Sequence, residues 1–203
     1  MFGIEKRRRK DAIRLFNSQM KTLETRGFTE IMEALQEKLD DVLFRVVEMK
    51  EIKISKSHIP FVAVIPLLGF DVETLMKMVI YDHNEGHSLL IQSELSNVVG
   101  VPSKPYFIFD VKDGETMLNK SPERAETLIK EQRRSCLTVG EGIALCIHAN
   151  VLYKHFLNCT GSRFENGYYV PIVHLLNDKP MLVCGPFDNW HDRYGSPSCL
   201  FRA

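Results

Sequence analysis

The sequence predicts an α+β fold: a single mixed-sheet domain over residues 51–203, preceded by an N-terminal helical arm over residues 1–50. Three observations support this prediction. Helical periodicity fills the first part of the chain, short apolar runs typical of strands recur between residues 59 and 184, and two clear helix starts fall among those runs. With 203 residues, of which 44% are hydrophobic and 26% charged, the chain can bury a core and is typical of globular proteins.

Two amphipathic helices are predicted in the arm. The first covers residues 5–26 and ends at Gly27, a residue type common at helix C-termini, and its apolar stripe is Ile13, Phe16, Met20 and Leu23. The second covers residues 29–49 and also carries a wide apolar stripe. The first helix is basic and the second acidic, so the two could pack together. Docking on the main domain and a homodimer contact through the N-terminal helices both stay open.

The main domain is predicted to alternate strands with two well-marked helices. Ser121 is a helix cap followed by Pro122 in the first turn, and this helix extends to about residue 132. Thr138 and Glu141 form a capping box that begins a buried helix. Residues 72–81 suit either a helix or a strand. Strands are expected over residues 59–66, 106–111, 156–164, 168–176 and 181–184.

Two further local features concern the last strands. Pro171 cannot donate to a ladder, so it predicts a bulge or an edge position for the strand over residues 168–176. Residues 177–180 are expected to form the turn of a hairpin that joins this strand to the next.

Composition argues against several classes of protein. The formal net charge is zero, so no global field favours nucleic acid, and the basic run at residues 6–10 is interpreted as a solvated helix start. No apolar run approaches the roughly 20 residues that span a bilayer. The first residues lack the apolar segment of a secretory signal. Five cysteines without a CxxC pair indicate free thiols, and we expect a cytoplasmic protein.

Neither a metal nor a cofactor is predicted. Asp82, His83, Glu85 and His87 place oxygen and imidazole donors in one loop, but Gly86 disfavours a helical pair of histidine ligands, and we interpret the segment as a polar loop. The Gly140–Gly142 segment resembles a dinucleotide loop only superficially, because its third glycine position is Leu145.

The favoured function is the binding of a small anionic ligand or peptide between the Thr138 helix start and the C-terminal loop. A helix start offers unpaired N–H groups and a positive dipole. Arginines suited to carboxylate or phosphate flank it in the sequence. The ligand-binding residues expected here are Arg134, Thr138, Ser162, Arg163 and Trp190. In the alternative arrangement Glu141 occupies the N–H groups and the arginines pair with acidic side chains.

A second hypothesis is an enzyme of the hydrolase or transferase type. His191 lies in an irregular segment and could serve as the base for Cys199 or Ser198 as the nucleophile. His174 and Cys184, by contrast, are expected in the core. No GxSxG elbow is present. In a third hypothesis the N-terminal helices make this protein an interaction or dimerisation module.

Several segments together resemble a known family. They are IPFV at 59–62, PYFIFDVKDG at 105–114, LTVGEGIAL at 137–145, GSR at 161–163 and WHDRYGSPSC at 190–199. The chain resembles a largely bacterial family of uncharacterised proteins, the domain of unknown function numbered 5701, over most of residues 28–199. The resemblance implies no activity and transfers no catalytic residue. It draws attention to Arg163, Trp190, His191, Ser198 and Cys199.

Overall fold

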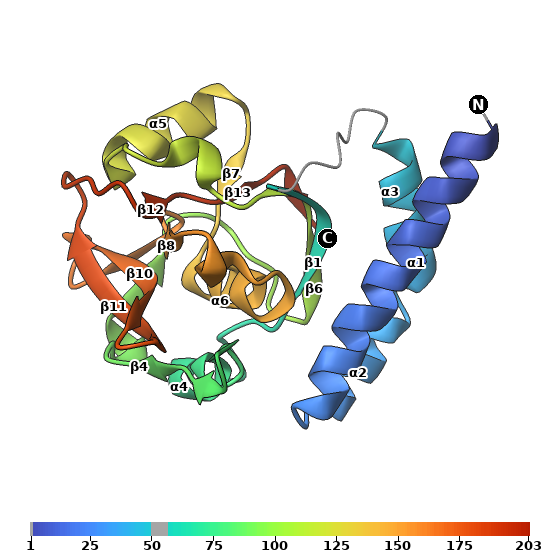
Figure 1. Cartoon of the computed structure of the whole chain (residues 1–203), viewed down its shortest axis with the longest axis horizontal. Helices are drawn as coiled ribbons and strands as arrows, with labels where there is room; N and C mark the ends of the chain where they lie inside the picture. Colours follow the sequence, from blue (N-terminus) through green and yellow to red (C-terminus); the bar gives the residue numbers. More distant parts are fainter. Residues whose placement is uncertain (1, 50–56) are drawn as a thin grey trace.

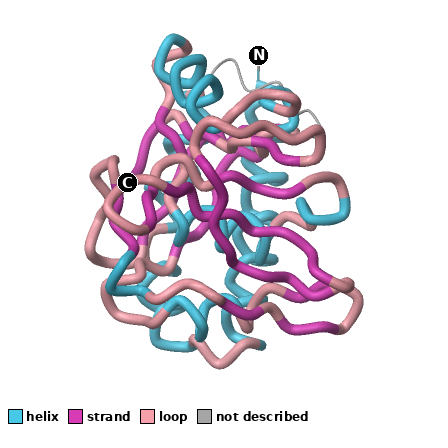
Figure 2. Tube along the Cα trace, turned by 90° about the vertical axis from the view of Figure 1, so that its left-hand side faces the viewer, coloured by secondary structure: helices cyan, strands magenta, loops and turns pink. Residues whose placement is uncertain are grey.

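The computed structural model describes residues 2–49 and 57–203 and confirms the predicted α+β class. A helical arm lies along one side of a body in which short strands surround the central helix α6 (Val139–His148) (Figure 1). Seen from the side opposite the arm, strands occupy much of the near face and the arm lies behind them (Figure 2). None of the helices in the described ranges is long and apolar enough to cross a membrane.

The arm consists of three helices, so the prediction of a single helix over residues 29–49 was wrong. After α1 (Phe2–Thr25) come α2 (Thr29–Gln36) and α3 (Leu39–Glu48), separated by a turn at residues 37–38. Both short helices contact α1. No glycine or proline marks the break, and each short helix buries its own apolar residues.

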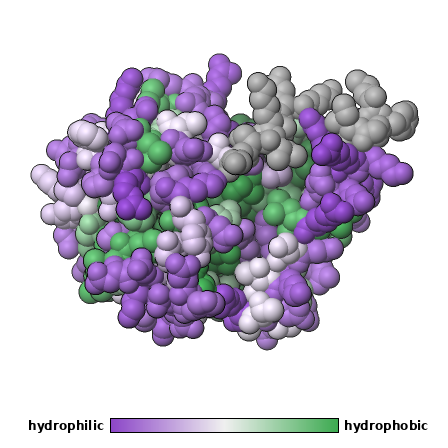
Figure 3. All heavy atoms as spheres, in the orientation of Figure 1, coloured by the Kyte–Doolittle hydropathy of each residue, from purple (hydrophilic) through white to green (hydrophobic). Residues whose placement is uncertain are grey.

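The arm is part of the main hydrophobic core. Phe16 of α1 is buried and stacks on Phe107 at a ring-centroid distance of 5.7 Å. Hydrophobic side chains are visible along the seam between the arm and the body (Figure 3). The buried amide of Gln19 donates to the carbonyl of Phe61 at 3.0 Å and accepts from the N–H of Ala63 at 2.7 Å. The apolar stripe of α1 is therefore covered within the same chain.

The first sheet is the one that contacts the arm. Its order is β1–β6–β13–β7, and β14 also pairs with β6. β1 and β6 are antiparallel, and β1 is an edge strand of this sheet. The Gln19 amide therefore satisfies backbone groups that face away from β6. The strands are β1 (His58–Val64), β6 (Tyr106–Lys112), β7 (Ser135–Cys136), β13 (Ser198–Cys199) and β14 (Phe201–Arg202).

The second sheet has the order β12–β8–β10–β11–β4, and β9 joins β5 to β10. The predicted strand over residues 156–164 is split into β8 and β9 by a turn. A separate small hairpin is formed by β2 (Ile80–Tyr81) and β3 (Asn84–Glu85). The strands of the second sheet are β4 (His87–Ser88), β5 (Leu95–Asn97), β8 (Phe156–Asn158), β9 (Ser162–Phe164), β10 (Tyr169–Leu176), β11 (Lys179–Pro186) and β12 (Tyr194–Gly195).

Two predictions about β10 were wrong. Pro171 lies in a central strand with an unbroken register to β11, without a bulge. Its carbonyl accepts from the N–H of Cys159, in the turn between β8 and β9, so its missing donor falls where the neighbouring strand is interrupted. The β10–β11 turn is shorter than expected: Asn177 and Asp178 form it with φ of 50° and 61°, as a two-residue hairpin requires.

The predicted caps are confirmed. Thr138 and Glu141 form the capping box of α6, and Ser121 caps α5 (Pro122–Glu131). The ambiguous segment at residues 72–81 contains both elements, α4 (Val72–Met76) followed by β2. Three short 3-10 helices complete the described chain: η1 (Gln92–Glu94), η2 (Glu115–Met117) and η3 (Val151–Tyr153).

Candidate functional site

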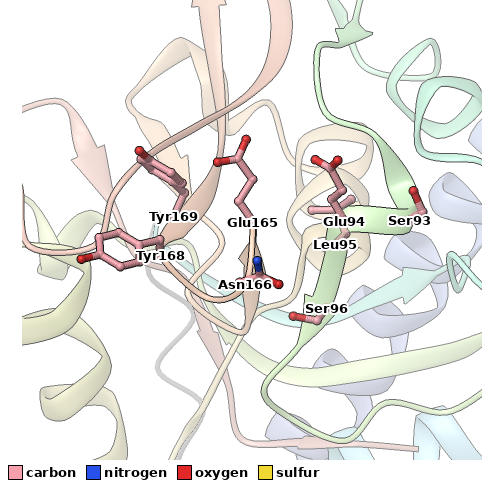
Figure 4. Close-up of a pocket in the computed structure, with 8 residues that line it drawn as sticks. All are labelled: Ser93, Glu94, Leu95, Ser96, Glu165, Asn166, Tyr168 and Tyr169. Carbon is pink, nitrogen blue, oxygen red and sulfur yellow. The ribbon is translucent and has the colours of Figure 1, made fainter.

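A wide hollow lies between the η1–β5 segment and the β9–β10 turn (Figure 4). It has a volume of about 760 Å³, and its lining residues are Ser93, Glu94, Leu95, Ser96, Glu165, Asn166, Tyr168 and Tyr169. A second hollow of about 440 Å³ adjoins it and is lined by Glu123, Gly167, Tyr168, Tyr169, Pro186, Phe187 and Asp188. Because both share the two tyrosines, we treat them together as the acidic groove.

One wall of the acidic groove is fixed by strand pairing. β5 pairs with β9, with Leu95 opposite Phe164. The preceding loop is anchored by Gln92, whose amide accepts from the N–H of Val72 at 2.6 Å and donates to the carbonyl of Leu67 at 3.0 Å. These contacts hold Glu94 at the rim.

The other wall is a turn with left-handed backbone. Glu165, Asn166 and Gly167 have φ of 47°, 55° and 94°, and the N–H of Tyr168 closes the turn on the carbonyl of Glu165 at 3.2 Å. Asparagine and glycine adopt such angles readily, whereas glutamate does so rarely. The turn projects Glu165 from the surface opposite Glu94, with both carboxylates pointing the same way (Figure 4). Tyr168 is 79% exposed.

The groove has a strongly negative lining. Glu94, Glu165, Glu123 and Asp188 are all exposed, and none of them forms an ion pair with another described residue. No lysine or arginine lines either hollow. Four unpaired carboxylates beside aromatic rings therefore face solvent, an arrangement that attracts cations rather than anions.

Arg163, predicted to bind a ligand, is instead bound within the fold. Its guanidinium donates to the carbonyls of Thr160 and Ser162 at 2.8 and 2.9 Å and to the carboxylate of Glu126 at 2.5 Å. It also lies 4.2 Å from the ring centroid of Phe187. Burial would raise the pKa of Glu126, but its ion pairs with Lys130 and Arg163 lower it. Arg163 thus supports the second hollow by tying β9 to α5 and Phe187.

At the α6 start, where an anion site was predicted, backbone N–H groups donate to groups of the chain itself. The N–H of Thr138 donates to Glu141 at 2.8 Å, and the N–H of Val139 donates to the Ser162 hydroxyl at 3.0 Å. Glu141 is fully buried and is held by Arg202, whose Nε and Nη2 donate to the two carboxylate oxygens at 2.6 and 2.8 Å. The alternative of internal capping is therefore the arrangement found.

Arg134 also serves the interior rather than a ligand. Its Nε donates to the hydroxyl of Ser198 at 2.9 Å and its Nη1 to the carboxylate of Asp110 at 2.8 Å. Burial would raise the pKa of Asp110, but hydrogen bonds and charge from Arg134 and His58 lower it. Asp110 has a left-handed φ of 54° within β6, a strained conformation that these bonds stabilise.

The structure does not bring the predicted catalytic residues together. Cys199 is 0% exposed, and burial raises the pKa of its thiol to about 12, which disfavours a nucleophilic thiolate. Ser198 is buried beside Arg134. His191 and Trp190 are both exposed and line a separate, smaller cavity that neither Ser198 nor Cys199 lines.

Two side chains of the segment considered for a metal have other partners. Asp82 accepts from the hydroxyl of Tyr153 at 3.0 Å, and His87 contacts the carboxylate of Glu73 at 3.0 Å. Within the described ranges, no three His, Cys, Asp or Glu side chains gather as a metal site would require.

Sequence reasoning missed the acidic groove because its residues come from separated loops. The Asn166-Gly167 pair was a local sign of a tight turn, and the adjacent Glu165 and Tyr168 were therefore candidates for exposure. Nothing local in the sequence indicated that Glu94 lies opposite that turn.

Comparison with known proteins gives a family match. Residues 20–173 match a family described as "Family of unknown function (DUF5701)". No curated protein and no solved structure matches. The match begins within α1 and ends within β10, so it extends further upstream than the expected span of residues 28–199 and leaves the 190–199 segment outside.

Proposed function

The chain belongs to the family of unknown function DUF5701, and from that premise we propose that it is an interaction module that binds a basic, extended peptide segment in the acidic groove. The observation that carries this proposal is the set of four exposed carboxylates without ion pairs that line two adjoining hollows. Nothing in this proposal requires chemistry, and no catalytic role is assigned to any residue.

The negative charge of the acidic groove favours a positively charged partner. Each hollow holds two carboxylates, Glu94 with Glu165 and Glu123 with Asp188. Lysine and arginine side chains would enter with a favourable potential, which raises the rate of encounter as well as the affinity. An anionic ligand, the class expected from the α6 start, would be repelled here.

The aromatic rings supply the second part of recognition. Tyr168 and Tyr169 lie between the two hollows, with ring centroids 6.1 Å apart, and Phe187 lines the second. A cation over such a ring gains about 0.5–1 kcal/mol at an exposed site. The aliphatic stems of lysine and arginine can also pack on the ring faces.

The shape favours an extended segment over a compact ligand. The two hollows are open to solvent and share Tyr168 and Tyr169 in their linings, so successive basic side chains could occupy them in turn. A single small cation would contact only one pair of carboxylates.

Fluorescence anisotropy with a labelled peptide of alternating lysine and glycine tests the proposal. The double variant Glu94→Gln/Glu165→Gln removes the charge of the first hollow. At about 0.5 kcal/mol for each exposed charge pair, it should weaken binding about fivefold. Binding of the unmodified protein should weaken as salt is raised, because exposed charges are screened.

The matched control is Glu24→Gln/Glu37→Gln, which makes the same change in net charge on exposed residues of the arm. It should bind the peptide as the unmodified protein does. Equal weakening by both double variants would show that only net charge matters. Equal affinity for a glutamate–glycine peptide would also contradict the proposal.

A further inference from the structure

We infer that a second, smaller cavity binds an uncharged, planar, single-ring compound that carries an amide-type edge. The cavity has a volume of about 190 Å³ and lies between strands β8, β10 and β11 and the loop over residues 189–194. It shares only Pro186 with the acidic groove. The residues that matter for the argument are Asn158, Ile172, Trp190, His191 and Tyr194.

The central observation is an amide that has no hydrogen-bond partner within the described chain and opens onto the cavity. Asn158 is 3% exposed and lines the cavity, yet its side chain forms no hydrogen bond with any other residue of the described ranges. Its polar atoms are not among the fully buried, unpaired atoms of the described residues, so they are accessible from the cavity that the residue lines. Asn158 therefore presents an unused donor and an unused acceptor to the cavity.

The strand register directs this amide to the face of the sheet that lines the cavity. Asn158 of β8 is opposite Ile172 of β10, so the two side chains lie on the same face of the sheet. The neighbouring Leu157 points the other way and is fully buried in the core. Gly185 leaves room for Ile172, because a Cβ there would lie 2.7 Å from the Ile172 Cδ1 atom.

The amide defines the edge of the ligand. An asparagine side chain holds one donor and one acceptor side by side in a plane. Its complement is a carboxamide, a lactam or a nucleobase edge, the pairing that asparagine makes with adenine in nucleic-acid recognition. A ring with only a hydroxyl or a carboxylate cannot form both bonds.

The walls define the rest of the ligand. Trp190, His191 and Tyr194 give the cavity aromatic faces, and the last two rings meet edge to face at 4.9 Å. No aspartate, glutamate, lysine or arginine lines it, which favours an uncharged ligand. An apolar cavity of about 150 Å³ holds benzene, so this one suits a single substituted ring.

The fluorescence of Trp190 can report whether a compound binds in this cavity. Trp190 is the single tryptophan in the sequence, so its fluorescence reports on this cavity alone. Uracil and nicotinamide are the probes, phenol is the comparison without an amide edge, and benzoate is the anionic comparison. We expect saturable changes in Trp190 emission with uracil and nicotinamide, and affinities for phenol and benzoate at least about tenfold weaker.

Asn158→Leu is the decisive variant, because leucine has nearly the shape of asparagine but no polar atoms. It should weaken uracil binding at least about tenfold while leaving the melting temperature unchanged, because the Asn158 side chain forms no hydrogen bond within the described chain that the substitution could remove. Asn17→Leu, at an exposed position of α1, is the matched control and should leave binding unchanged.

Four results would overturn the inference: phenol binding as tightly as uracil, unchanged uracil binding by Asn158→Leu, a lowered melting temperature of that variant, or no saturable response to either amide probe. Loss of peptide binding in the acidic-groove variants would leave Trp190 titrations unaffected. The two proposals can therefore fail separately.

Discussion

Replacing Arg202 by leucine is expected to destabilise the fold strongly. The change leaves the fully buried carboxylate of Glu141 without its counter-charge. Tyr106 donates to the same carboxylate at 3.0 Å, but a neutral hydroxyl cannot replace the guanidinium. Arg202 also donates to the hydroxyl of Ser135 at 2.6 Å and to the carbonyl of Cys136 at 2.9 Å, and both bonds are lost.

The magnitude follows from the burial of the pair. Removing one partner of a buried ion pair costs about 3–5 kcal/mol, because an uncompensated charge stays in the interior. For a chain of this length, each kcal/mol lowers the melting temperature by about 2–4 °C, so a fall of roughly 6–20 °C is expected. A total stability of about 5–15 kcal/mol leaves most of the range compatible with a folded variant.

Urea denaturation followed by circular dichroism measures the effect, within a double-mutant cycle. The variants are Arg202→Leu, Glu141→Leu and the combination of the two. Since the double variant buries no unpaired charge, it should be more stable than the sum of the single effects implies, by about 2 kcal/mol or more. A cost below about 1 kcal/mol for Arg202→Leu, or an additive cycle, would refute the reasoning.

Two further predictions concern polar side chains of α1 and α6. Gln19→Leu leaves the carbonyl of Phe61 and the N–H of Ala63 unpaired, so urea denaturation should show a loss of about 2–4 kcal/mol, and a loss below about 1 kcal/mol would contradict this. Burial lowers the pKa of His148 from 6.5 to about 4, so between these values the unfolded state binds the proton more readily. Stability should therefore fall as pH is lowered from 6.5 to about 4, and His148→Leu should flatten that dependence in denaturation curves recorded across this range.

The features predicted correctly from the sequence depend on short-range chemistry. The Thr138 capping box and the Ser121 cap each need only residues within one helical turn, so sequence spacing determines them. The break at residues 37–38 has no such local cause. It depends on how two short helices pack against α1, and tertiary packing of this kind overrides helix propensity.

The partners of the arginines in the expected anion site could not be predicted from the sequence. The sequence identified Arg134 and Arg163 as notable, but their partners, Asp110 and Glu126, lie in other elements. The arginine that matters at the α6 start is Arg202, which is distant in the sequence. Which charges neutralise each other is decided by the fold, and spacing along the chain does not reveal it.

The hydrogen bonds of Gln19 also bear on how the edge of β1 is protected. An exposed edge strand is a template on which a strand from another molecule can add. The Gln19 amide forms hydrogen bonds with the carbonyl of Phe61 and the N–H of Ala63, so these two groups are not available to another strand. A fragment beginning at residue 28 would lack α1, which uncovers the β1 edge and the core side chains that α1 covers. We expect such a fragment to aggregate through strand addition. In the full chain, α1 therefore protects the β1 edge from pairing with a strand of another molecule.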